Sequence, residues 1–167
     1  MARPIILADA SPLIALGVAG QLLLLKELFE KVKTTAIVLA EVAPGGERPL
    51  PGETEILQAI RAKWLTPLPL EWDEPIFSFL DAGEESILRA ASNLRAPSLL
   101  LIDDLPARAA AKNLGFAVTG TAGILVRAKR QGLLSAVRPV VETLHACGFR
   151  LSTELIKAIL VEANETY

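Results

Sequence analysis

Short apolar runs alternate along the chain with longer segments in which apolar residues recur every three or four positions. Residues 5–8 and 99–102 are wholly apolar runs, which are typical of central strands in a parallel sheet covered on both faces. The segments that follow these runs have the periodicity of helices with one apolar face. The alternation therefore predicts a doubly wound α/β fold built on one parallel sheet.

The remaining elements follow from the same pattern and from capping residues. Ser11 is expected to be the N-cap of a helix with Pro12 at its first position, and Thr35 is expected to cap a helix that runs through Glu41. Further strands are predicted at 32–34, 64–70 and 116–119. Further helices are predicted at 22–29, 55–62, 83–94, 106–114 and 121–131, and a helical tail at 137–165 with a break at 148–149. The Pro- and Gly-rich segment 44–54 is predicted to be a loop.

The 167 residues are expected to form a single domain, 1–167, with a helical C-terminal part from about 137. Apolar residues make up 51% of the chain and aromatic residues 5%, which predicts a core of Leu, Ile, Val and Ala. Cys147 is the only cysteine, which excludes an internal disulfide, and it is expected to be a small buried side chain. The longest apolar stretch, 13–25, is too short to span a bilayer, so no membrane association and a cytoplasmic location are expected.

Acidic residues follow the predicted strands or begin the predicted helices at four places. Asp9 follows the first strand, Asp103 and Asp104 follow the strand at 99–102, and Glu41 and Glu84 lie on helices. Because the carboxyl ends of parallel strands meet at one edge of a sheet, these carboxylates are expected to converge. Carboxylates that share a crevice repel one another unless a cation neutralises them. The pattern therefore predicts a site for Mg²⁺ or Mn²⁺ and metal-assisted phosphodiester chemistry.

Each acidic position also has a simpler explanation. A helical glutamate such as Glu41 is most often a solvated surface charge, and Glu84 is stabilised by the helix dipole at a helix start. Asp81 competes with Glu84 for a role in the site, and one aspartate of the 103–104 pair can cap the next helix. The sequence does not decide between Asp103 and Asp104 as a ligand.

Three further residues are candidates for contacts with the substrate. Ser11 and Thr121 are expected to bring hydroxyl groups to the same crevice, and Arg108 is expected to hold a phosphate. The net charge of −2 gives the protein no global basic field that would attract a nucleic acid. Local patches and the metal must supply that attraction.

The chain resembles the PIN-domain family in the order and spacing of several motifs. The matching segments are Asp9-Ala10-Ser11-Pro12-Leu13-Ile14, Val38-Leu39-Ala40-Glu41-Val42, Leu80-Asp81-Ala82-Gly83-Glu84-Glu85, Leu101-Ile102-Asp103-Asp104 with Ala107-Arg108, Val118-Thr119-Gly120-Thr121-Ala122-Gly123 and Ala128-Lys129-Arg130-Gln131-Gly132-Leu133. Each motif is weak alone, but together they cover nearly the whole chain. They are most similar to a prokaryotic PIN subgroup marked by Gly-Glu and Gly-Thr-x-Gly elements.

The resemblance implies a three-layer α/β/α sandwich around a short, mostly parallel sheet and a metal-dependent endoribonuclease. It also implies that Asp9, Glu41, Glu84 and one of Asp103 and Asp104 form the acidic set. By resemblance, the protein would act on RNA as the toxin of a toxin–antitoxin pair, with an antitoxin protein as partner. One departure from the family pattern is that Glu84 stands where the better-known toxins have an aspartate.

Two alternatives to a nuclease remain open at this stage. One is a non-catalytic PIN-like module that binds nucleic acid or protein, although such a module has no use for clustered carboxylates. The other is a phosphotransfer domain, but the sequence Asp9-Ala10-Ser11 lacks the second aspartate of an Asp-x-Asp nucleophile motif. The run Leu22-Leu23-Leu24-Leu25 is expected to supply a homodimer face or a groove for an antitoxin helix, with core packing as the simpler explanation.

Overall fold

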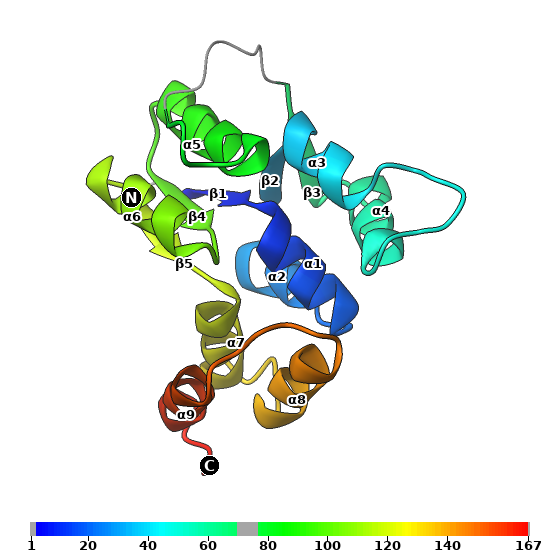
Figure 1. Ribbon diagram of the computed structural model, residues 1–167, viewed down its shortest axis with the longest axis vertical. Helices are drawn as coiled ribbons and strands as arrows, with labels where there is room; N and C mark the ends of the chain where they lie inside the picture. Colours follow the sequence, from blue (N-terminus) through cyan, green and yellow to red (C-terminus); the bar gives the residue numbers. More distant parts are fainter. Residues whose placement is uncertain (1–2, 70–76, 167) are drawn as a thin grey trace.

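The computed structural model of the protein describes residues 3–69 and 77–166 (Figure 1). Five strands form one sheet in the order β3-β2-β1-β4-β5, and every neighbouring pair is parallel. The strands are β1 Ile5–Ala8, β2 Val32–Thr35, β3 Leu65–Leu68, β4 Ser98–Leu101 and β5 Ala117–Thr119. The predicted parallel sheet is therefore confirmed, with β1 at its centre.

Helices connect the strands and extend the chain beyond the sheet. They are α1 Ala10–Val18, α2 Leu23–Phe29, α3 Ala36–Val42, α4 Glu53–Arg61, α5 Ala82–Leu94, α6 Leu105–Asn113, α7 Thr121–Arg130, α8 Arg138–Ala146 and α9 Thr153–Glu162. Helices α5 and α6 cover one face of the sheet, and α1, α2 and α7 cover the other (Figure 1). This is a PIN-like three-layer α/β/α arrangement, and α8 and α9 lie beyond α7.

The apolar runs pack as the pattern predicts. Leu7 in β1 and Leu100 and Leu101 in β4 are fully buried, because helices cover both faces of these central strands. Within the run at 22–25, three leucines are buried and only Leu23 is exposed, at 62% of its surface. Core packing therefore explains most of this run.

Two local expectations are wrong. Helix α1 begins at Ala10 with Asp9 at the N-cap position, so Ser11 lies inside the first turn and is not the cap. Cys147 is exposed and lies at the C-cap position, just after α8 ends at Ala146. In contrast, the Thr35 hydroxyl accepts a hydrogen bond from Val38 N–H and caps α3, as predicted.

Among the described residues, no single helix has both the length and the apolar character needed to cross a membrane. Helices α1 and α2 reach that length only as a pair, and the pair is bent by 117° at its break.

The packing of α1 against the start of α4 depends on two glycines. A Cβ atom on Gly17 would lie 2.9 Å from the Cα atom of Gly52, which is closer than real Cβ atoms approach backbone. We expect Gly17→Ala to lower the free energy of unfolding by about 1–3 kcal/mol despite its better helix propensity, because the two backbones must separate. Urea denaturation measures the change. Gly46→Ala is the matched control, since its Cβ atom would meet nothing closer than 3.9 Å, and an equal loss in both variants would contradict the packing argument.

Candidate functional site

The site begins at the carboxyl end of the central strand. The Asp9 N–H donates to the Leu101 carbonyl oxygen at 3.0 Å, which holds the end of β1 beside the end of β4. Asp9 occupies the N-cap position of α1, but its carboxylate makes no capping hydrogen bond. The residue is only 3% exposed. A buried carboxylate that does not cap its helix is available for another role.

The start of α5 brings two more carboxylates to this edge. The Asp81 carboxylate accepts from Glu84 N–H at 2.8 Å, and the Glu84 carboxylate accepts from Asp81 N–H at 3.1 Å. These reciprocal bonds are a capping box, which satisfies two backbone donors at the helix start. Asp81 and Glu84 therefore both lie at the site, and each also has a structural role.

Glu41 reaches the same place from the last turn of α3. Its carboxylate lies against Gly83, where a Cβ atom would come within 2.9 Å of both Glu41 carboxylate oxygens. The absent side chain of Gly83 thus makes room for the Glu41 carboxylate. The Thr35 and Ser86 hydroxyls are 2.6 Å apart and buried, and they hold the start of α3 against α5.

The electrostatics link carboxylates from three elements. Burial raises the pKa of Asp9 to about 7; the Ala10 backbone N–H opposes this, and the charges of Asp81, Glu84 and Glu41 add to it. Burial and Asp81 likewise raise the pKa of Glu41, against a hydrogen bond from the Gly83 backbone. Carboxylates from the ends of β1, α3 and α5 therefore converge at one place.

Asp104 joins this set through Glu84. Burial raises the pKa of Glu84, and the charges of Asp81, Asp104 and Glu41 raise it further, against a backbone hydrogen bond from Asp81. The Asp104 carboxylate also accepts from Ala107 N–H at 3.0 Å and caps α6. Asp104 thus both starts α6 and contributes negative charge to the cluster.

Asp103 points to a different neighbour. Its two carboxylate oxygens accept from Thr121 N–H at 2.7 Å and from the Thr121 hydroxyl at 2.6 Å. A Cβ atom on Gly120 would lie 2.5 Å from one Asp103 oxygen and 2.9 Å from an Arg108 nitrogen. The Arg108 guanidinium donates to the Ile102 carbonyl oxygen at 2.7 Å. Asp103, Arg108 and Thr121 therefore form one group where β4, β5 and α7 meet.

The cluster suits a hydrated divalent cation in its chemistry. In the part of the chain that the structure describes, no three His, Cys, Asp or Glu side chains are close enough together to form a complete set of metal ligands. Mg²⁺ does not require such a set, because it binds through one or two carboxylates and keeps several waters. Carboxylate oxygens are the donor type that this ion prefers. Asp9, Glu41, Glu84 and Asp104 are the residues that fit such a hydrated ion.

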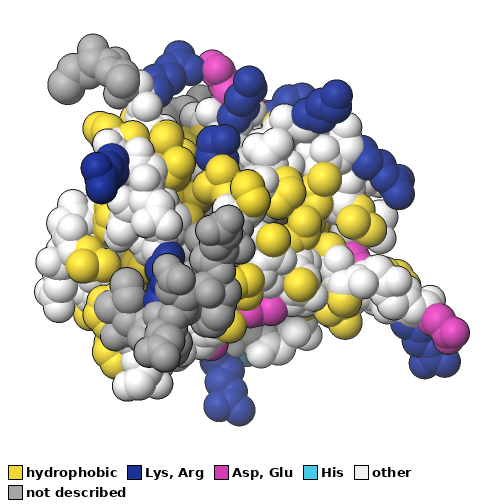
Figure 2. Space-filling model, turned by 90° about the horizontal axis from the view of Figure 1, so that it is seen from above, with side chains coloured by type: hydrophobic (Ala, Val, Ile, Leu, Met, Phe, Trp, Pro, Cys, Tyr) yellow, Lys and Arg dark blue, Asp and Glu magenta, His cyan; other side chains and the backbone are white. Residues whose placement is uncertain are grey.

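Basic side chains are scattered on the face seen in Figure 2, where Lys and Arg side chains form separate groups with apolar side chains between them. This distribution agrees with the low net charge of the chain. On that face, a polyanion would be attracted by single cations.

Sequence reasoning missed several features around the site. It treated Asp81 and Glu84 as competitors and missed the capping box that joins them, although their spacing is a signal of one. The room that Gly83 and Gly120 leave for neighbouring carboxylates has no sequence signal apart from the glycines themselves. Phe149 and Arg150 line a pocket with Ser11, Asp103 and Thr121, and only the folded tail brings them there.

Comparison with protein families gives one match that covers almost the whole chain. A family model described as a PIN domain matches residues 5–165. Comparison with curated proteins and with solved structures gave no significant match.

Proposed function

Because the chain belongs to the PIN-domain family, a group of nucleases, we propose that it is a Mg²⁺- or Mn²⁺-dependent endoribonuclease that hydrolyses RNA phosphodiester bonds. The proposal rests on one observation above all. Burial raises the pKa values of Asp9 and Glu84, and the charges of carboxylates on α3 and α5, and for Glu84 also of Asp104, raise them further, so these groups lie near one another at a single sheet edge. Capping explains Asp81, Glu84 and Asp104 in part, but it does not explain the buried Asp9.

The proposed roles follow from burial and hydrogen bonding. Asp9 is buried and does not cap its helix, so it is the residue best placed to hold the cation, with Glu84 and Asp104 beside it. Glu41 is exposed and is fixed by Gly83, so it is suited to orient the attacking water and accept its proton. A bound divalent cation would make that water more acidic and offset the charge on the scissile phosphate.

The remaining candidates are assigned to the substrate. The Arg108 guanidinium uses one N–H group on Ile102, and a guanidinium carries five donors, so it can also hold a phosphate. Ser11 is exposed near Asp9, and the Thr121 hydroxyl is bound to Asp103. Of the Asp103–Asp104 pair, we assign Asp104 to the cation because its charge acts on Glu84.

The biological setting is a further part of the proposal. By its family, the protein would be the toxin of a prokaryotic toxin–antitoxin pair in the cytoplasm, with RNA as substrate and an antitoxin protein as partner. A homodimer is also expected. These assignments rest on the family resemblance and on the exposed Leu23 of α2.

Cleavage of a mixed RNA pool tests the proposed function. We expect the protein to cut the pool with Mg²⁺ or Mn²⁺ and to lose activity to background in EDTA, with recovery when metal is returned in excess. Gel electrophoresis of end-labelled RNA measures the cutting. Cutting that persists in EDTA would contradict a metal-dependent enzyme. The absence of cutting on a broad pool, in a protein that still binds RNA, would favour a non-catalytic binding module.

A further inference from the structure

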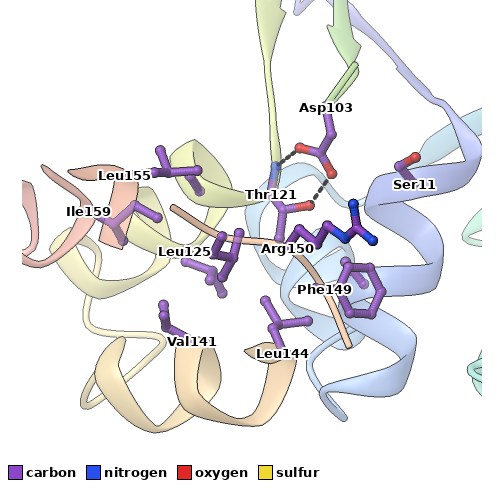
Figure 3. A pocket seen from close by; sticks show the side chains of 13 residues that line it. Ser11, Asp103, Thr121, Leu125, Val141, Leu144, Phe149, Arg150, Leu155 and Ile159 are labelled. Atoms are coloured by element: carbon purple, nitrogen blue, oxygen red, sulfur yellow. Dashed lines mark hydrogen bonds between the residues drawn. The ribbon is translucent and has the colours of Figure 1, made fainter. Parts of the chain in front are cut away.

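A pocket lies between α1, α7 and the C-terminal tail (Figure 3). Its volume is about 290 Å³. Helices α1 and α7 form one side, and α8, the connection at 147–152 and α9 form the other. This volume is near the lower end for small-molecule sites, so the pocket suits one ring system rather than an extended chain.

One end of the pocket is polar and adjoins the proposed reaction site. It is formed by Ser11, Thr121 and Asp103. Ser11 follows Asp9 by two residues, and Asp103 precedes Asp104, so this end lies beside the backbone that carries two carboxylates of the cluster. Thr121 holds Asp103 with two hydrogen bonds, and a carboxylate has further lone pairs for N–H donors from a ligand.

The walls and the opening have complementary chemistry. Leu125, Leu144 and Leu155 contribute apolar surface, and Phe149 contributes an aromatic ring. Arg150 lines the same pocket and is exposed. In Figure 3 its guanidinium points toward the end formed by Ser11, Thr121 and Asp103. The pocket therefore offers an aromatic ring, apolar walls, an acceptor at its end and one cation.

We infer that this pocket binds one unpaired nucleobase of a single-stranded RNA, next to the phosphodiester bond that is cut. The inference rests on the proposed function and adds a substrate class to it. A base has flat faces that pack against Phe149 and apolar side chains, and N–H groups that donate to Asp103. Its phosphate pairs with Arg150. Guanine fits best, because it presents two adjacent N–H donors to one carboxylate.

A side chain from a protein partner fits the pocket less well. An apolar side chain would fill the walls but leave the Asp103 carboxylate without a donor. A cationic side chain would pair with Asp103 but would meet Arg150, which has the same charge. A nucleotide matches both charges, because its base carries donors for Asp103 and its phosphate carries negative charge for Arg150.

NMR titration of the full-length protein in EDTA tests the inference without any cleavage. The probes are guanosine 5′-monophosphate, guanosine and inorganic phosphate. We expect the nucleotide to shift the amide signals of Phe149, Arg150 and Thr121. Arg150→Gln should weaken nucleotide binding about fivefold or more and leave guanosine binding nearly unchanged. Phe149→Leu keeps apolar volume but removes the ring, so it should weaken both ligands by a similar factor.

Arg61→Gln is the matched control. Arg61 is exposed at the end of α4, just before β3, and β3 is the edge strand of the sheet farthest from the pocket. Nucleotide shifts elsewhere, or equal affinities in all four proteins, would overturn the inference. Binding that depends on Arg150 alone, and that inorganic phosphate reproduces, would also overturn it, because no base would then be recognised. If the protein cuts RNA but the nucleotide does not bind in the pocket, the proposed nuclease function is supported and the pocket inference is wrong. If the nucleotide binds in the pocket but the protein never cuts RNA, the pocket inference is supported and the proposed nuclease function is wrong.

Discussion

Asp9→Asn is expected to lower metal-dependent RNA cleavage by about 10³-fold, the largest loss of any single substitution in the cluster. Asparagine has the same shape and can accept the same hydrogen bond from Ala10 N–H, but it has no negative charge to hold a cation. Initial cleavage rates of wild type and variant, purified identically, measure the loss. Activity that survives in the variant would identify a contaminating nuclease or place the site elsewhere.

Without metal, Asp9→Asn is expected to raise the free energy of unfolding, although it lowers activity. The pKa of Asp9 is about 7 in the folded protein, against 3.8 for the unperturbed side chain. Between these values the folded state binds the proton and the unfolded state does not, so the free energy of unfolding falls as pH rises through this window. The full difference amounts to about 4 kcal/mol as an upper bound. The loss of stability caused by ionising the buried Asp9 is absent below about pH 4 and complete above about pH 7.

Urea denaturation at pH 5 and pH 8 in EDTA measures this effect. We expect Asp9→Asn to be more stable than wild type at pH 8, with a smaller difference at pH 5. Excess Mg²⁺ should stabilise wild type at pH 8 and leave the variant nearly unchanged, because the ligand acts only on a state that binds it. Glu142→Gln on α8, an exposed site, should behave like wild type. If Mg²⁺ stabilised Asp9→Asn as much as wild type, Asp9 would not be a residue that binds the metal.

The fold followed from the sequence because its signals are local. The apolar run at 5–8 has no polar position and must be covered on both faces, and Thr35 caps its helix through a bond to a residue three positions away. Ser11 failed as a cap because Asp9 is held by the hydrogen bond from its N–H to Leu101, which fixes where β1 ends and α1 begins. A contact between strands thus overrode a local preference.

The candidate site followed from the sequence only in outline. The ends of parallel strands predict that Asp9 and the 103–104 pair approach one another, but not which aspartate faces the cluster. Thr121, which binds the Asp103 carboxylate, lies 18 residues away in the sequence, so no local signal distinguishes Asp103 from Asp104. The tail was predicted as helices, yet nothing local indicates that Phe149 and Arg150 return to the site. Such contacts depend on how α8 and α9 pack against α7.

Glu41→Gln is expected to lower RNA cleavage by about 100-fold while the protein stays folded. Glu41 is exposed, so glutamine in its place leaves no buried charge without a partner. What is lost is the group that accepts a proton from the attacking water. Glu55→Gln is the matched control, because Glu55 is exposed and lies away from the cluster. It is on α4, whose start packs against Gly17 near the C-terminal end of α1, whereas Asp9 precedes the N-terminal end of α1. Similar losses in both variants would indicate a general effect of charge.

Gly83→Ala tests the position of the Glu41 carboxylate without changing Glu41 itself. The new Cβ atom would lie 2.9 Å from both Glu41 carboxylate oxygens, and the flexible Glu41 side chain must move away. We expect about a tenfold loss of activity, with the free energy of unfolding unchanged or raised by up to about 1 kcal/mol, since alanine favours the helix.

The double variant shows whether Gly83 acts through Glu41. If it does, adding Gly83→Ala to Glu41→Gln costs no further activity, so the two effects are not additive. A further tenfold loss in the double variant would mean that Gly83 affects cleavage by another route. Ala82→Gly is the companion variant: it weakens the same helix turn but leaves the space beside Glu41 unchanged, so stability should fall and activity should not. Together, these variants separate the position of the Glu41 carboxylate from the stability of α5.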